Sequence, residues 1–382
     1  MILWMRNNVM PSIQSDPFHI KNTISSFHAA RKTDLMKAGH TKLIPPAEAY
    51  PSQNMDDFRC GLSFYGARLV GDSEYISIRQ TVLRLLTVEN GRFVIGHGLD
   101  GMIIDNQDRV MSEPSCFCNH GLYNVSKRLP DLPYHELNDD VFLSFDGAAR
   151  NYYHWLLYAV SKMQIAKRIL PDFVKFIIPD AIKSFATRNP AFSQEVFNSS
   201  LAVAGLSDRV TPLEDGIYRA RRIHYLWHSP TMPELYLNME APHRLFDLFD
   251  VPHNPELPER FYVGRAMDGS GRITPDEQAL IDPILEQEGY TKVFLEGMDF
   301  RTQVALFRQA TSIIAPHGAG LANLVFSRKG TKLLELNRRL DNQNHLRNCF
   351  YLIAANRGIH YKFYNMGGSP ITAERFLSAL HA

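Results

Sequence analysis

The segment Ser312-Ile-Ile-Ala-Pro-His317-Gly318-Ala-Gly320-Leu-Ala-Asn323 decides how the C-terminal part of this chain folds. A short apolar run ends at a turn that contains two glycines, and a second apolar run follows it directly. This order of strand, tight turn and helix is typical of one unit of a parallel α/β sheet. Glycine lets the backbone approach a bulky anion, and the first N–H groups of a helix have no partner inside it. The turn is therefore either a phosphate site or a tight connection that needs glycine for space alone.

The segments around this turn repeat the same alternation of strand and helix. The capping box Thr274-Pro275-Asp276-Glu277 predicts a helix from 274 to about 289, and Pro283 is expected to kink it. Apolar periodicity predicts further helices at 301–310, 321–327 and 344–356, and strands at 261–264, 292–295, 312–315, 332–336 and 359–364. This order predicts a doubly wound α/β unit.

The chain upstream of residue 250 shows a second α/β alternation. Strands are predicted at 141–145, 176–179 and 223–226, with helices at 152–170 and 193–204. Residues 60–115 show short alternating runs separated by glycines, which predicts a small, mainly antiparallel β region. Residues 1–55 have weak periodicity and are expected to be irregular. Three prolines within 251–260 predict a linker between two α/β halves, with a cleft between the halves.

The composition is that of a globular protein with no excess of basic charge. The 382 residues include 41 Lys and Arg against 40 Asp and Glu, which argues against a nucleic-acid partner. The short basic cluster Arg219, Arg221 and Arg222 is interpreted as a solvated strand edge. Four cysteines are too few for a disulfide scaffold, and none has the spacing of a zinc site.

The sequence also gives an expectation about location. No apolar run approaches 18 residues, and the first ten residues make a poor signal peptide. We therefore expect a cytoplasmic protein, with peripheral attachment to the inner face of the membrane left open.

A second loop between a strand and a helix contains two candidate catalytic residues. It reads Phe145-Asp146-Gly-Ala-Ala-Arg-Asn-Tyr-Tyr-His154-Trp155. His154 falls in the first helical turn, where the helix dipole disfavours the imidazolium and keeps the ring available as a base. The alternative is a structural histidine that packs beside Trp155.

Three charged residues near predicted strand ends are candidate ligand contacts. Arg265 and Arg272 flank a glycine-rich loop, where a guanidinium suits phosphate, although a surface ion pair is the alternative. Glu335 lies in an apolar strand and needs a partner, for which a ribose hydroxyl would serve.

Other motifs are missing or misplaced. The literal G-x-G-x-x-G at 96–101 precedes a predicted strand rather than a helix, so it is interpreted as a decoy and not a dinucleotide site. The chain has no Asp-x-Asp, G-x-S-x-G, H-E-x-x-H or Walker A motif.

Taken together, these segments resemble the family 61 glycosyltransferases, formerly a domain of unknown function. That family includes EGF-domain N-acetylglucosaminyltransferases, plant xylan-decorating enzymes and bacterial capsule-type proteins, the last being the kind this chain resembles. Thr274-Pro275 departs from the asparagine that the family commonly has soon after its second arginine. The matching segments are Arg260-Phe-Tyr-Val-Gly-Arg265, Arg272-Ile273, 303–307, Ala315-Pro-His-Gly-Ala-Gly-Leu321 with Asn323, Phe326 and Glu335, Asn151-Tyr-Tyr-His-Trp155, and the hairpin at 101–112.

The resemblance implies two Rossmann-like domains of the GT-B type, inversion at the anomeric carbon and no metal requirement. On that basis, residues 1–55 are an irregular extension and 56–250 a β-rich plus α/β acceptor domain. Residues 251–366 are the Rossmann-like nucleotide-sugar domain, and 367–382 a C-terminal helix.

The resemblance and the residues together give each candidate a role. A nucleotide sugar, with a UDP-sugar expected, is the donor, and a glycan or lipid-linked saccharide is the acceptor in polysaccharide biosynthesis. His154 is the first candidate for general base and Asp146 the second. The donor contacts are Arg265, Arg272, His317, Gly318, Ala319, Gly320, Asn323 and Glu335. A nucleotide-sugar epimerase or hydrolase, and a non-catalytic nucleotide-sugar-binding protein, are the alternatives.

Overall fold

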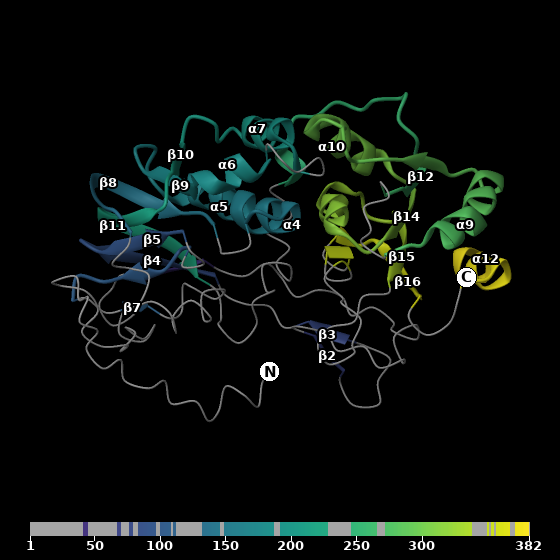
Figure 1. The fold of residues 1–382 in the computed structure, drawn as a ribbon, viewed down its shortest axis with the longest axis horizontal. Helices are drawn as coiled ribbons and strands as arrows, with labels where there is room; N and C mark the ends of the chain where they lie inside the picture. The colour runs from purple at the N-terminus through teal and green to yellow at the C-terminus, as the bar shows by residue number, and fades with distance from the viewer. Residues whose placement is uncertain are drawn as a thin grey trace.

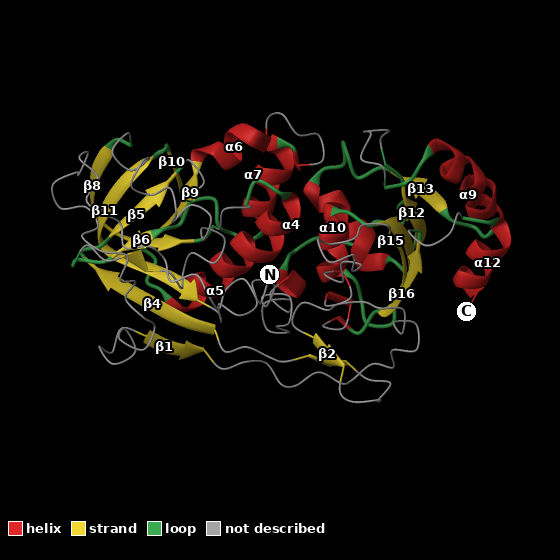
Figure 2. Cartoon of the chain, turned by 60° about the horizontal axis from the view of Figure 1, so that its bottom comes forward, coloured by secondary structure: helices red, strands yellow, loops and turns green. Residues whose placement is uncertain are grey.

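The chain folds around two sheets, and helices from both halves lie between them (Figures 1 and 2). The computed structural model describes residues 41–44, 67–69, 76–78, 83–96, 100–107, 110–111, 132–145, 149–186, 192–227, 246–265, 272–337, 350, 353–354, 357–366 and 371–381. The mixed α/β class expected from the sequence is confirmed at this level.

The N-terminal sheet joins the β-rich region to the first α/β strands. Its strand order is β10-β9-β8-β11-β5-β6-β7, with β4 also paired to β11 and β1 paired to β4. Strands β8 to β11 run parallel, whereas β4 and β5 are antiparallel to β11. The β-rich region is thus continuous with the α/β strands, through β11. The strands are β1 (Thr41–Ile44), β4 (Leu83–Glu89), β5 (Arg92–Ile95), β6 (Ile103–Ile104), β7 (Val110–Met111), β8 (Tyr134–Leu143), β9 (Lys175–Pro179), β10 (Val210–Leu213) and β11 (Gly216–Trp227); β2 (Ala67–Leu69) and β3 (Ile76–Ile78) form a separate pair.

One sequence interpretation in this part is confirmed, and another is corrected. Gly96 and Gly101 flank the turn between β5 and β6, where the N–H of Gly101 donates to Val94 O (3.0 Å), so the G-x-G-x-x-G motif is a hairpin. The basic cluster does not lie at a strand edge, because β11 is an interior strand that pairs with β8 on one side and with β4 and β5 on the other; there Arg221 and Arg222 contact the buried carboxylate of Asp140 at 2.7 and 3.4 Å.

A long helical segment follows β8, as the sequence predicts. It consists of α4 (Tyr152–His154), a π-helical turn η3 (Trp155–Val160) and α5 (Ser161–Ile169). Asn151 caps it by accepting a hydrogen bond from the N–H of Tyr153 (2.9 Å). Two more helices, α6 (Asp180–Ala186) and α7 (Gln194–Val203), precede β10, and the Trp155 indole donates to Ser200 on α7 (2.9 Å).

The C-terminal sheet is wholly parallel and has the order β13-β12-β14-β15-β16. β12 comes first along the chain and β13 is added on one side of it, whereas β14, β15 and β16 are added in turn on the other side. The direction of winding therefore reverses between β12 and β14. Ligands of open α/β sheets bind at such a switch point, outside the carboxyl ends of the strands. The strands are β12 (Arg260–Val263), β13 (Thr291–Val293), β14 (Ser312–Pro316), β15 (Lys332–Asn337) and β16 (His360–Asn365).

Helices cover both faces of this sheet. The predicted capping box of α9 (Pro275–Gln287) is present, with Thr274 and Glu277 bonded reciprocally, and Pro283 lies inside the helix. α12 (Ala373–His381) packs beside α9 over one face, and α10 (Phe300–Gln309) and η7 (Ala319–Phe326) lie toward the N-terminal half (Figures 1 and 2). η7 is a 3₁₀ helix where the sequence predicted an α-helix. The helix predicted at 344–356 lies largely outside the described residues.

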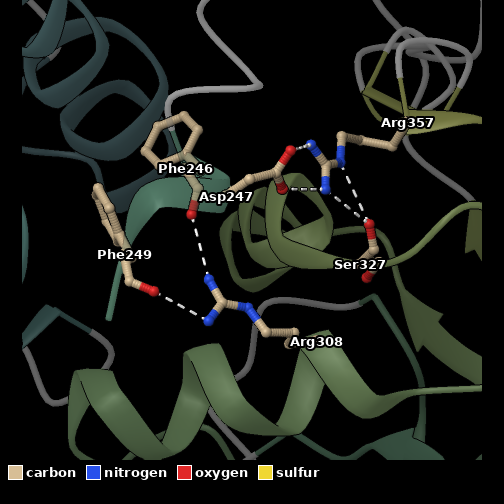
Figure 3. A network of polar contacts seen from close by, with 6 residues as sticks. All are labelled: Phe246, Asp247, Phe249, Arg308, Ser327 and Arg357. Atoms are coloured by element: carbon tan, nitrogen blue, oxygen red, sulfur yellow. Dashed lines mark hydrogen bonds and ion pairs between the residues drawn. The ribbon is translucent and has the colours of Figure 1, made fainter. Parts of the chain in front are cut away.

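The segment just before the proline-rich stretch is tied to the C-terminal half (Figure 3). The Arg308 guanidinium of α10 donates to the carbonyls of Phe246 (3.2 Å), Phe249 (3.0 Å) and Val251 (3.1 Å). Arg357 forms a two-pronged ion pair with Asp247 (2.6 and 3.1 Å). η6 (Phe246–Leu248) is thus bonded to the C-terminal half, although the sequence places it before the expected boundary at 251.

The two halves also meet at their helix starts. The buried Tyr152 hydroxyl at the start of α4 donates to Asn323 Oδ1 of η7 (2.5 Å). Burial raises the pKa of Tyr152 far above its usual range, so it remains a hydrogen-bond donor. In the part of the chain that is described, no helix has both the length and the apolar character needed to span a membrane.

Candidate active site at the carboxyl ends of β12, β14 and β15

The candidate site is built around the turn that follows β14. The first bond of η7 runs from Leu321 N to Gly318 O (3.0 Å), so the N–H groups of Ala319 and Gly320 precede it and are not used by the helix. Gly318 has an extended backbone (φ 178°, ψ 164°), which any residue can adopt. The need for glycine at 318 therefore comes from its neighbours and not from its backbone angles.

Arg265 is the neighbour that lies closest to Gly318. A Cβ at Gly318 would overlap the Arg265 guanidinium, which reaches across from the end of β12. The switch point of the sheet thus places a cation directly against the glycine turn. A Cβ at Gly320 would instead lie 2.7 Å from Leu295 Cδ1, so that glycine makes room for packing.

Arg272 comes from the other end of the loop after β12. Its guanidinium donates to the backbone carbonyl of His317. Both arginines expected from the sequence therefore contact the turn, one at Gly318 and the other at His317. The structure brings these two positive charges to one end of β14.

The side chain of His317 points toward β15, where it meets Glu335. Its Nδ1 lies 2.5 Å from Glu335 Oε1, and the other carboxylate oxygen accepts a hydrogen bond from the Tyr361 hydroxyl (2.5 Å). The strand register explains this, because Glu335 pairs with Ala315 and Tyr361 with Leu333. Side chains two positions apart on a strand share a face, so the three side chains gather on one face of the sheet.

The burial of Glu335 argues against the ribose contact expected from the sequence. Its side chain is fully buried, and both carboxylate oxygens are engaged, one by His317 and one by Tyr361. A buried carboxylate needs such partners. As it stands, Glu335 holds the His317 ring and offers no free oxygen to a ligand.

Asn323 is likewise fully buried inside the protein. Its amide accepts from Tyr152 (2.5 Å) and donates to Gln303 Oε1 (2.9 Å). Gln303 in turn donates to the carbonyls of Leu295 (3.3 Å) and Met298 (3.0 Å). In this structure the Asn323 amide links the start of α4 to α10, and its expected donor contact stays a prediction.

His154 lies half-buried at the last residue of α4, immediately before the π-helical turn. Its ring stacks on Tyr158 (5.1 Å between centroids, 17°) and meets Tyr153 edge-on (5.5 Å, 72°). π-Helical turns inside α-helices are frequent at functional sites. Asp146, the second candidate base, lies outside the described residues.

An aromatic row connects the two histidines. Tyr153 packs edge-on against Phe350 (5.7 Å, 88°), and Phe350 packs against the His317 ring (4.9 Å, 58°). The sequence placed His154 on the far side of the linker from the glycine turn. The fold brings the α4 start and the glycine turn together instead.

The sequence interpretation missed four contributors to this region. Tyr361 and Phe350 carry no local motif, and Tyr152 and Gln303 were noted only as parts of segments that carry the family resemblance. Their partners Asn323, Glu335 and Tyr153 lie between 20 and 197 residues away along the chain, so no local pattern could have paired them. Within the described residues, no three His, Cys, Asp or Glu side chains cluster as metal ligands would.

Comparison with known proteins places this site within a family. Residues 152–334 match the model described as Glycosyltransferase 61, a range that begins at Tyr152 and ends one residue before Glu335. No curated protein sequence matches the chain. The match spans just under half of the chain, and it identifies residues 152–334 as a family 61 glycosyltransferase region and the protein as a glycosyltransferase.

Proposed function

We propose that the enzyme transfers a sugar from a nucleotide-sugar donor to a hydroxyl of a glycan or lipid-linked saccharide, with inversion at the anomeric carbon. One observation carries the proposal: the Arg265 guanidinium lies against Gly318 at the switch point of a parallel sheet. A diphosphate needs backbone N–H donors and positive charge, and both are found at the end of β14.

The donor diphosphate is assigned to the N–H groups of Ala319 and Gly320, with Arg265 and Arg272 as counter-charges. When the glycosidic bond breaks, negative charge grows on the leaving phosphate. Donors already in place stabilise that charge without reorganising, which is where catalysis by fixed dipoles arises. The two α/β halves correspond, in this proposal, to the donor and acceptor domains of a GT-B enzyme.

The acceptor hydroxyl is assigned to the side of the N-terminal half. The start of α4, with His154, faces the C-terminal half through Tyr152 and Tyr153. His154 is the base that the sequence favours, and Asp146 its rival. The two alternatives from the sequence, an epimerase or hydrolase and a non-catalytic binder, differ from a transferase in what they do to the donor.

A panel of nucleotide sugars tests the proposal. UDP-, GDP-, dTDP- and CMP-sugars are added in turn, and the thermal unfolding midpoint is measured. A donor present at about 100 times its Kd stabilises the fold by about 2.7 kcal/mol. The donor that binds is then incubated with a mixture of oligosaccharide acceptors, and the products are identified by mass spectrometry. If no nucleotide sugar raises the midpoint, the proposed donor class is wrong.

A further inference from the structure

We propose that His317 is the general base of the transfer, with Glu335 and Tyr361 as positioning residues. This inference rests on the proposed function and deepens it. It reassigns His317, which the sequence placed among the donor contacts, and it takes the role of base away from His154.

The hydrogen bonds to Glu335 define which nitrogen of His317 can act. A carboxylate only accepts hydrogen bonds, so Nδ1 must donate its hydrogen to Glu335 Oε1. Nε2 then carries the lone pair. Among the described residues, none forms a hydrogen bond with Nε2. The Tyr361 hydroxyl holds Glu335 through its second oxygen, so the carboxylate cannot rotate away.

The direction of the His317 ring separates it from the donor phosphate. β12 and β15 flank β14 on opposite sides. A side chain at Gly318 would point at Arg265 from β12, whereas the His317 ring is turned toward β15 and Phe350. In an inverting displacement, the base and the leaving phosphate lie on opposite sides of the anomeric carbon. The Arg265 charge lies on the β12 side of the turn and the His317 ring on the β15 side, which matches this arrangement.

The environment of His317 also places it toward the acceptor half. Phe350 packs on the His317 ring and on Tyr153, which precedes His154 in α4. The residues on this face of the sheet, such as Ile313 and Leu333, belong to one apolar cluster that includes residues of both halves. The opposite face packs in a separate cluster with α9 and α12.

His154 is less suited to this role in the structure. Its ring lies flat against Tyr158 and edge-on to Tyr153, so both neighbours of the ring are aromatic side chains of its own helical segment. The charged groups around His317 are Glu335 at Nδ1, Arg272 at its carbonyl and Arg265 at the next residue. His317 combines a buried carboxylate at Nδ1 with a second ring nitrogen that forms no hydrogen bond to a described residue.

The proposed step balances as a single displacement. Nε2 of His317 takes the proton from the acceptor hydroxyl while its oxygen forms a bond to the anomeric carbon. The bond from that carbon to the phosphate oxygen breaks, and its electron pair leaves with the nucleoside diphosphate. The imidazolium that forms is stabilised by Glu335, as a carboxylate stabilises the histidine of a serine-protease triad.

The test measures donor binding and turnover separately in full-length variants. Calorimetry with UDP gives the affinity. Turnover is followed as UDP release from the UDP-sugar that binds, with water in place of the acceptor. His317→Ala is expected to lower kcat by about 10²-fold or more, with UDP affinity within about threefold of the wild type. Added imidazole is expected to restore part of the turnover. As a control, His360→Ala, which changes an exposed histidine on β16, is expected to keep kcat.

Glu335→Gln and Tyr361→Phe test the positioning role. An amide at 335 can donate to Nδ1 and force the hydrogen onto Nε2, so kcat should fall by about 10²–10⁴ at unchanged UDP affinity. Tyr361→Phe removes a single hydroxyl and is expected to lower kcat by about tenfold. Because this change is small, the variant can be measured even if the other variants fold poorly. The proposal is overturned if His317→Ala loses UDP binding instead, or if Tyr361→Phe and Glu335→Gln both keep kcat. If wild-type protein binds no nucleotide sugar, the proposed function fails first.

Discussion

The contact between Gly318 and Arg265 makes a specific prediction about Gly318→Ala. The backbone angles of Gly318 suit alanine, so the substitution adds one methyl group and no backbone strain. That methyl would occupy the space of the Arg265 guanidinium, whose long side chain can move aside. The fold should therefore survive while the positive charge leaves the glycine turn.

The size of the effect follows from the interaction that is lost. A hydrogen bond to a charged group contributes about 1.5–3 kcal/mol, so losing one between Arg265 and the diphosphate should weaken UDP binding about 10- to 100-fold. Calorimetry with UDP measures this directly. The thermal unfolding midpoint should stay within a few degrees of the wild type, because no core packing is removed.

A double-mutant cycle with Arg265→Ala separates this mechanism from a general disturbance of the turn. If Gly318→Ala acts by displacing the guanidinium, the double variant should bind UDP no more weakly than Arg265→Ala alone. Additive losses, or an unchanged Kd in Gly318→Ala, would refute the reasoning.

Three further predictions concern metal use, stability and pH. Turnover should persist in excess EDTA, since the chain has no Asp-x-Asp; a loss that only Mn²⁺ or Mg²⁺ reverses would contradict this. Arg308→Met should lower the free energy of unfolding by about 2–4 kcal/mol, because it removes three hydrogen bonds from a charged group to backbone carbonyls. Arg301→Met, which loses one bond to Asp250 O, should cost less than about 1 kcal/mol. Equal losses of the two variants in denaturant melts would show that the network of Figure 3 is unimportant. Burial lowers the pKa of His224 below its usual 6.5, so the unfolded chain binds a proton there first and stability should fall as pH drops below about 6.5. Melts at pH 5 and pH 7 should show a smaller drop in His224→Gln, and an identical drop would rule out this contribution.

The sequence alone determined the local structure and the family. Apolar periodicity predicted the strands of the C-terminal sheet, and the capping box at Thr274 fixed the start of α9. The strand, glycine turn and helix around Gly318 were readable because each depends on neighbours within a few residues. Arg265 and Arg272 were found for the same reason, as charged groups next to predicted strand ends.

The tertiary structure decided which residues meet. Glu335 was predicted to need a partner, but only the register of β14, β15 and β16 supplied His317 and Tyr361. Asn323 carried a family motif, and packing between the two halves turned its amide toward Tyr152. Strand order and register are set by which faces of the sheet are buried, and that burial depends on residues from the entire chain. A local pattern therefore shows that a buried polar group needs a partner, and only the packed structure identifies that partner.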